Sequence, residues 1–156
     1  MKMITLLTVS ILAFVTLSAS AQSRNKKQPA QKTNHVHEAK FTHRIVIQIS
    51  SGDTLEHKGL MTNLRNLKEG WGDSVELEVV VHGPGIELVT NAKTTQNETI
   101  QKMIANGVRF VVCRNTMKMR NVTEDQIIPN VGFVPMGVGE IVLKQEQGWS
   151  YLKAGF

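Results

Sequence analysis

The run VRFVVC at residues 108–113, continued directly by RNTMK at residues 114–118, decides the fold of this 156-residue chain. Its first part is almost continuously apolar, which is typical of a strand buried on both faces of a parallel sheet. Residues 115–119 predict a short helix that starts directly after Cys113. A strand that runs into a helix is the repeating unit of α/β proteins, so the same alternation is expected on either side.

That alternation extends along residues 42–156. Four further strand patterns are predicted at residues 43–50, 75–82, 130–135 and 149–153. The helix patterns between them run from an Asp53 cap to Gly70, from a cap at Thr95 or Asn97 to Gly107, and over 139–147, with short helical pieces at 86–90 and 123–128. Right-handed crossovers then give the fold class: α/β, a three-layer sandwich with a mainly parallel five-stranded sheet and helices on both faces.

Residues 1–21 have the features of a secretory signal peptide. Lys2 precedes an apolar stretch over 4–17, and Ala19 and Ala21 occupy the small-residue positions of a cleavage site. The stretch is short for a membrane span, which needs about 20 apolar residues, although an uncleaved anchor is the alternative. The sequence therefore predicts a periplasmic or secreted protein, without stable insertion in the membrane after cleavage.

Residues 22–41 have almost no apolar side chain, and we interpret them as a basic, flexible tether. They hold five Lys or Arg against one Glu, whereas the domain at 42–156 has twelve basic and twelve acidic residues. The net charge of +5 therefore arises mainly outside the domain. A formally neutral domain gives no indication of a basic groove, so no nucleic-acid partner is expected.

Cys113 is the first candidate for a functional residue. The working crevice of a parallel sheet lies outside the carboxyl ends of its strands, where Cys113 is predicted to lie. As the only cysteine it cannot form an internal disulfide. A thiol at the first turn of a helix meets unpaired backbone N–H groups that favour the thiolate, and Arg114 could add to this effect. The alternative is a small buried side chain that closes the strand.

Other residues at the same edge are weaker candidates. His82 ends the neighbouring strand and could act as a base toward Cys113, although a turn histidine bonded to nearby backbone is the alternative. Gly83 and Gly85 could cradle an anion, although such closely spaced glycines more often form a tight turn. The GVG at 137–139 lacks the remaining features of a dinucleotide fingerprint or a P-loop, so no nucleotide cofactor is expected.

The histidines near the start of the domain were considered as metal ligands. A transition metal could be coordinated by His35, His37 and His43, but no cysteine or carboxylate cluster completes a coordination shell near them. We therefore expect no metal site and no cofactor.

Three groups of residues together resemble the DsrE/DsrF-like family, and most closely its exported branch. They are HGPG at 82–85, Cys113-x-Asn115-Thr116-Met117, and QGW-x-Y at 147–151. The likeness runs over about 45–155 and implies the three-layer fold and assembly into homotrimers or hexamers. In the sulfur-carrying members a cysteine after a central strand holds sulfur as a persulfide and passes it to a partner, and Cys113 matches that cysteine by position. Small residues and an Arg-Gly pair follow it in the carrier pattern, whereas here the chain continues RNTMKMRN.

Two functional hypotheses result. In the first, an exported protein handles sulfur through Cys113 as its catalytic thiol or persulfide, with a sulfur donor or acceptor protein, or a small sulfur species, as partner. In the second, a non-catalytic oligomeric binding protein holds a small anion or a partner in the crevice. The predicted binding residues are His82, Gly83, Gly85, Asn115 and Thr116. Whether the protein is an enzyme stays open at this point, because the reactivity of Cys113 decides it.

Overall fold

The computed structural model describes residues 43–155, so the signal peptide predicted at 1–21 and the tether predicted at 22–41 lie outside the described residues. The strands are β1 (His43–Ile49), β2 (Val75–Val81), β3 (Val108–Cys113), β4 (Gly132–Val134) and β5 (Ser150–Lys153). The helices are α1 (Thr54–Trp71), α2 (Asn97–Ala105), α3 (Arg114–Arg120) and α4 (Gly137–Glu146). Three 3₁₀ segments lie between them: η1 (Gly72–Ser74), η2 (Gly83–Val89) and η3 (Glu124–Gln126). Within this part of the chain, no helix has the length and apolar character that a membrane crossing requires.

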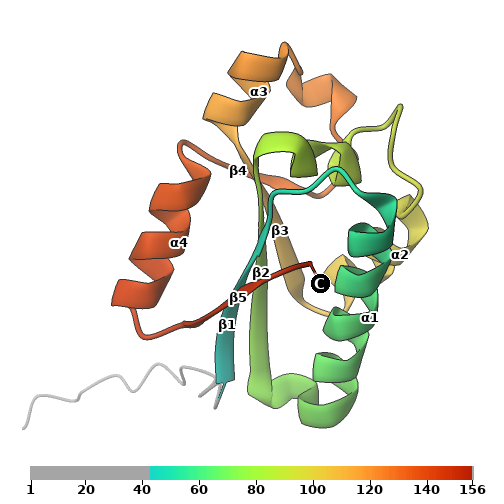
Figure 1. The fold of residues 1–156 in the computed structure, drawn as a ribbon. Helices are drawn as coiled ribbons and strands as arrows, with labels where there is room; N and C mark the ends of the chain where they lie inside the picture. Colours follow the sequence, from blue (N-terminus) through green and yellow to red (C-terminus); the bar gives the residue numbers. More distant parts are fainter. Residues whose placement is uncertain (1–42, 156) are drawn as a thin grey trace, which may run out of the picture. The chain divides into compact units, whose positions relative to one another are not determined.

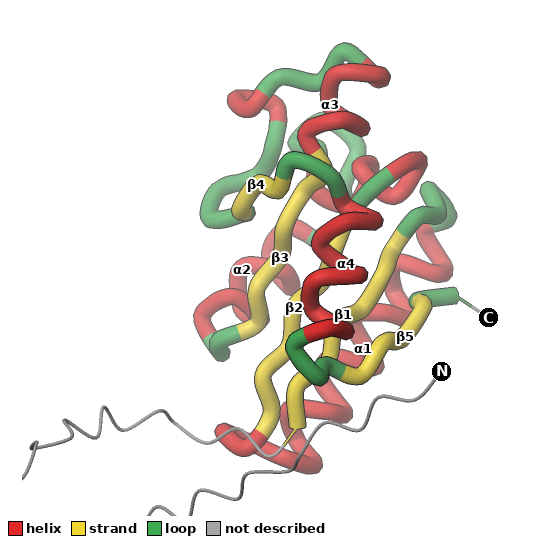
Figure 2. The backbone as a smooth tube through the Cα atoms, turned by 90° about the vertical axis from the view of Figure 1, so that its left-hand side faces the viewer, coloured by secondary structure: helices red, strands yellow, loops and turns green. Residues whose placement is uncertain are grey.

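The five strands form one sheet in the order β4-β3-β2-β1-β5, and every neighbouring pair is parallel. The connections from β1 to β4 step in one direction, and the last crossover carries the chain from β4 to β5 at the opposite edge. Helices α1 and α2 cover one face of the sheet, and α4 covers the other (Figures 1 and 2). The predicted three-layer α/β sandwich is therefore confirmed, with a sheet that is parallel throughout.

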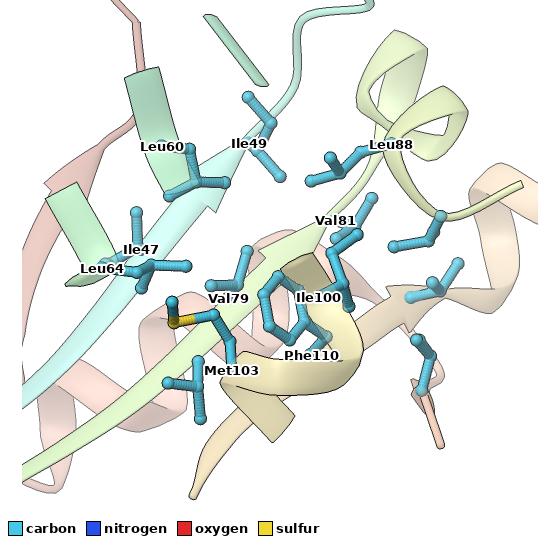
Figure 3. Packing of buried hydrophobic residues seen from close by; sticks show 14 of the residues in the cluster. Ile47, Ile49, Leu60, Leu64, Val79, Val81, Leu88, Ile100, Met103 and Phe110 are labelled. Carbon is cyan, nitrogen blue, oxygen red and sulfur yellow. The ribbon is translucent and has the colours of Figure 1, made fainter. Parts of the chain in front are cut away.

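The larger apolar core lies between the sheet and the pair α1 and α2, as Figure 3 shows. Leu60 and Leu64 of α1 and Met103 of α2 pack over Val79 and Phe110 of the central strands, and none of the five is more than 7% exposed. A side chain of this size contributes roughly 1.5–3 kcal/mol when it is fully buried rather than exposed. This face therefore supplies most of the apolar stabilisation.

The face under α4 has a smaller apolar cluster and more polar groups. The cluster consists of Val46, Val80, Ile141 and Trp149. The expectation that β3 is buried on both faces is wrong here, because Arg109 is exposed and Val111 is only half-buried. Among residues 43–155, α4 is the one long helix on this side, whereas two helices share the other, so coverage is less complete.

The predicted capping signal is confirmed at α1 and is wrong at α2. Asp53 caps α1, where its side chain accepts a hydrogen bond at 2.7 Å from the backbone N–H two residues on. At α2 the predicted cap at Thr95 or Asn97 is wrong, because Gln96 is the N-cap residue and no side chain caps the helix. The hydroxyl of Thr94 accepts from the backbone N–H of Gln96 at 3.1 Å. The nearest hydroxyl therefore stabilises the loop before α2 instead of the helix itself.

Candidate functional site

Cys113 lies where β3 passes directly into α3. It is the N-cap residue of α3, with extended backbone angles (φ −71°, ψ 113°), and its side chain is buried at 5% exposure. No residue separates strand from helix, so the first backbone N–H groups of α3 lie beside the sulfur. Those of Asn115 and Thr116 both lower the pKa of the Cys113 thiol. Cys113 therefore lies at the carboxyl edge of the sheet, as predicted. Figure 1 shows α3 beyond the end of β3.

A second helix begins against the same cysteine. α4 starts at Gly137, two residues earlier than predicted, and the backbone N–H of Gly137 also lowers the pKa of the Cys113 thiol. A Cβ atom at Gly137 would lie 3.1 Å from the Cβ atoms of both Cys113 and His82 and 3.4 Å from Cγ1 of Val80. Glycine is the residue that permits this approach. The N-termini of α3 and α4, with their partial positive charge, therefore meet at one thiol.

Thr116 connects the sulfur to the turn after β2. Its side chain is 4% exposed, and its hydroxyl oxygen accepts a hydrogen bond from the backbone N–H of Gly83 at 3.0 Å. The hydroxyl proton remains available to the sulfur of Cys113, and the Thr116 side chain lowers the pKa of that thiol. Gly83 has a φ of +53°, which points its N–H toward α3 and which glycine adopts without strain.

These donors act against burial on the acidity of the thiol. Burial is the largest single influence and raises the pKa of Cys113. The hydroxyl of Thr116 and the backbone N–H groups of Gly137, Thr116 and Asn115 together lower it by a larger amount, so the pKa lies below the ordinary value of a cysteine. The predicted help from Arg114 is wrong, because Arg114 pairs with Glu124 and lies over the ring of Phe133.

His82 follows the last residue of β2 and lies next to Cys113. Val81 pairs with Val112 in the sheet, so the residues that follow them, His82 and Cys113, are neighbours. A Cβ atom at Gly137 would lie 3.1 Å from the Cβ atoms of both residues, so these two Cβ atoms lie within twice that distance of each other. Burial lowers the pKa of His82, which keeps its ring neutral at neutral pH. Its Nε2 lies 2.7 Å from Nε2 of Gln48 on β1. The ring is therefore bonded to a side chain of a neighbouring strand.

The remaining predicted binding residues have different surroundings. Gly85 is buried, and a Cβ atom there would lie 2.5 Å from the carbonyl oxygen of Ile49, so the glycine lets η2 pack on the end of β1. The side chain of Asn115 is exposed, and its contact with Cys113 is made through backbone N–H. The structure thus brings together Cys113, His82, Gly83, Thr116 and the backbone of Asn115, while Gly85 has a packing role.

The histidines considered as metal ligands do not meet. His43 stacks on Trp71 with ring centroids 4.0 Å apart, at the end of the sheet opposite Cys113, and His35 and His37 lie outside the described residues. Within residues 43–155, no group of three or more His, Cys, Asp or Glu side chains could hold a metal ion.

Sequence reasoning missed three residues of this site. Gly137 entered only as part of a weak nucleotide pattern, because no local pattern marks it as the place where α4 approaches two other side chains. Tyr151 belongs to the QGW-x-Y group, but no role was assigned to it. The hydroxyl of Tyr151 donates to Oε1 of Gln48, the residue bonded to His82. Gln48 had no recognisable signal, because one polar residue in a strand is typical of any half-covered sheet face.

Comparisons with known proteins agree with this architecture. A family model described as the DsrE/DsrF-like family matches residues 43–154. Among solved structures, the protein of unknown function MTH1491 from Methanobacterium thermoautotrophicum is 31% identical with a TM-score of 0.68, over 71% of this chain and 98% of that one. The conserved protein of unknown function BT1422 from Bacteroides thetaiotaomicron shares the fold at 21% identity and a TM-score of 0.56, over 70% and 93%. No curated protein matches the chain.

Proposed function

The chain belongs to the DsrE/DsrF-like family, and from this premise we propose that it accepts and passes on sulfane sulfur as a persulfide of Cys113. The observation that carries the proposal is the convergence of two helix N-termini and a threonine hydroxyl on the Cys113 thiol, which agrees with the lowered pKa of that thiol. The thiolate is the nucleophile in sulfur chemistry, and these groups favour it over the thiol.

The transfer step needs no cofactor. The thiolate of Cys113 attacks the terminal sulfur of a persulfide or polysulfide donor, R–S–SH. A new S–S bond forms at Cys113 while the S–S bond of the donor breaks, and the remainder leaves as the thiolate R–S⁻ with the bonding electron pair. No net oxidation occurs, because the sulfane sulfur changes only its partner. The acceptor step is the same reaction in the reverse sense.

The burial of Cys113 restricts what can reach it. At 5% exposure the sulfur can meet a terminal sulfur atom but not a bulky electrophile without movement of its neighbours. The flanking side chain of Met136 is half exposed and lies at the start of α4. We propose that it lines the approach, so that a small inorganic species or an extended persulfide side chain is the donor.

The location and assembly of the protein form part of the same proposal. The features of residues 1–21 support export to the periplasm or beyond, and the family resemblance supports a homotrimer or hexamer. An exported thiol is exposed to oxidation, and burial of Cys113 would slow the steps that end in irreversible sulfonic acid.

The test is to measure the alkylation rate of Cys113 against pH by intact mass. We expect a midpoint below about 8.5, the value for a free cysteine. Since the chain has one cysteine, the Cys113→Ser variant gives the background directly. In parallel, incubation with polysulfide should add the mass of one sulfur atom, which dithiothreitol removes and which Cys113→Ser never shows.

A midpoint at or above that value, with no sulfur gain in the native protein, would overturn the proposal. Cys113 would then be core packing, and the crevice of a non-catalytic binding protein would be the function to test next.

A further inference from the structure

We propose that Gln48 and Tyr151 are positioning residues that keep the ring proton of His82 on Nδ1, so that His82 donates a hydrogen bond to the sulfur atom carried by Cys113. The inference rests on the proposed function, which it deepens by giving the transferred sulfur a binding partner.

The residues form a continuous polar row across four adjacent strands. Gln48 pairs with Val80 on β2, and Val46 pairs with Tyr151 on β5, so the alternate side chains of these strands share the face covered by α4. On this face the hydroxyl of Tyr151 donates to Oε1 of Gln48, and Nε2 of Gln48 lies 2.7 Å from Nε2 of His82. The row ends beside Cys113 on β3.

The orientation of the Gln48 amide favours one tautomer of His82. With the Tyr151 hydroxyl donating to Oε1, the amide nitrogen of Gln48 is turned toward His82 and can only donate, so Nε2 accepts and the proton of the neutral ring is on Nδ1. In the proposed arrangement Nε2 is bonded to Gln48 on β1, and the Nδ1–H group on the other side of the ring is directed toward β3, the strand that carries Cys113.

The Nδ1–H group of His82 can bind an atom that the other hydrogen-bond donors of the site do not bind. The backbone N–H groups and Thr116 stabilise Sγ of Cys113 itself, whereas a persulfide extends one sulfur atom beyond Sγ. Once the terminal –SH of the persulfide has lost its proton to solvent, this outer sulfur carries the negative charge, and a neutral Nδ1–H can bind it without giving up its own proton. The balance of the transfer step is therefore unchanged, and His82 lowers its barrier by binding charge.

Other ionisable groups near His82 are mostly paired elsewhere. Those on the surrounding elements include Cys113 on β3, Arg114 and Lys118 on α3, Glu87 on η2, Glu140 on α4, and Tyr151 and Lys153 on β5. Arg114 pairs with Glu124, Glu87 with Lys93, and Glu140 with Lys144. Lys118 and Lys153 are exposed. Cys113 is thus the ionisable group that bears on His82.

The experiment combines imidazole ¹⁵N NMR with sulfur loading by polysulfide. In the wild type we expect the His82 signal, assigned by its loss in His82→Gln, to report a proton on Nδ1.

Gln48→Glu offers only an acceptor to Nε2, so the proton should move to Nε2 and the pKa of His82 should rise. Sulfur loading of Cys113 should slow by about tenfold, the effect of one lost hydrogen bond. Tyr151→Phe should give a mixture of tautomers and an intermediate rate. Gln147→Glu makes the same charge change on an exposed side chain at the other end of α4 and should alter neither measurement.

The outcomes separate this inference from the proposed function. If wild-type protein loads sulfur but His82 carries its proton on Nε2, or if Gln48→Glu loads at the wild-type rate, the positioning role is wrong and the persulfide role stands. If wild-type Cys113 takes up no sulfur at all, the proposed function fails, and with it the use of His82, whatever the tautomer.

Discussion

At the residue scale, Cys113 differs from an ordinary buried cysteine in the number of hydrogen-bond donors around its sulfur. Burial alone would raise the pKa of the thiol and make it inert. Three backbone N–H groups and one hydroxyl reverse that direction. Of the four, the hydroxyl of Thr116 is the one that a substitution can remove without changing the backbone.

Replacing Thr116 with valine should therefore raise the pKa of Cys113. The isosteric side chain keeps the volume of a residue that is 4% exposed but has no proton for the thiolate. One hydrogen bond corresponds to roughly one pH unit in the alkylation midpoint. Since the midpoint moves upward, the thiolate fraction at neutral pH falls and alkylation there slows by about tenfold.

Two further variants isolate the hydroxyl. Thr116→Ser retains it and should stay close to the wild type, while Thr62→Val removes an exposed hydroxyl that bonds only to the carbonyl of Lys58. An unchanged midpoint in Thr116→Val, in protein that remains folded, would show that backbone groups alone set the acidity of Cys113.

At the scale of elements, strands and helices could be predicted where the hydrophobic pattern of a segment and its length indicated the same kind of element. The five strands and the helices between them follow from β-branched runs, capping residues and glycines, and even the capping box of Thr123 and Gln126 is present. That box stabilises only the 3₁₀ turn Glu124–Gln126, because the predicted helix over 123–128 has no apolar face long enough to pack. A capping signal indicates where a helix can start, whereas the length of the helix depends on its tertiary contacts.

The candidate site was predictable only in part, for a related reason. Cys113, Thr116 and the turn at Gly83 could be placed because each follows a strand end. The start of α4 at Gly137 depends on two side chains from other strands, and no local pattern contains that information. The row of Tyr151 and Gln48 depends on β5 lying beside β1, which is a consequence of the last crossover.

The contact between α4 and the sheet includes a buried carboxylate. Glu78 on β2 is 2% exposed, and its Oε2 lies 2.8 Å from Arg109 and 3.0 Å from Lys144 of α4, while its Oε1 has no partner among the described residues. Burial raises the pKa of Glu78 against the opposing effect of Lys144. The ion pairs therefore offset a desolvation penalty, and they also fix where α4 lies over the sheet.

Removing one partner of Glu78 should destabilise the domain more than removing both charges. Lys144→Met leaves the carboxylate with Arg109, whose side chain is 49% exposed, and we expect a loss of about 2–4 kcal/mol in the free energy of unfolding. Lys144→Met combined with Glu78→Leu should recover most of it, because no buried charge remains. Denaturant unfolding measures both, with Lys153→Met as the control on an exposed lysine. A double variant less stable than Lys144→Met would contradict this account.

At the scale of the whole molecule, the outer side of α4 is the feature that the isolated domain leaves unexplained. Gly137 and Ile141 face the sheet, whereas Val138, Val142 and Leu143 are each more than 50% exposed. Val138 and Val142 are four residues apart and share one stripe of the helix. Exposed apolar side chains that are grouped in this way often mark a surface that binds another molecule.

A second copy of the chain is the occupant that we expect for this stripe, in agreement with the trimer or hexamer that the family resemblance implies. Closed symmetric assemblies are the usual form of homo-oligomers, and such an assembly would cover the helix whose first residue contacts Cys113. Light scattering should therefore give a trimeric or hexameric mass for the wild type and a monomeric mass for Val142→Asp, because an unpaired charge in an apolar interface is strongly unfavourable. Leu55→Asp introduces the same charge at a 61% exposed position on α1 and should leave the mass unchanged. A wild-type monomer at micromolar concentration would exclude this assembly, and an unchanged mass in Val142→Asp would place the interface on another surface.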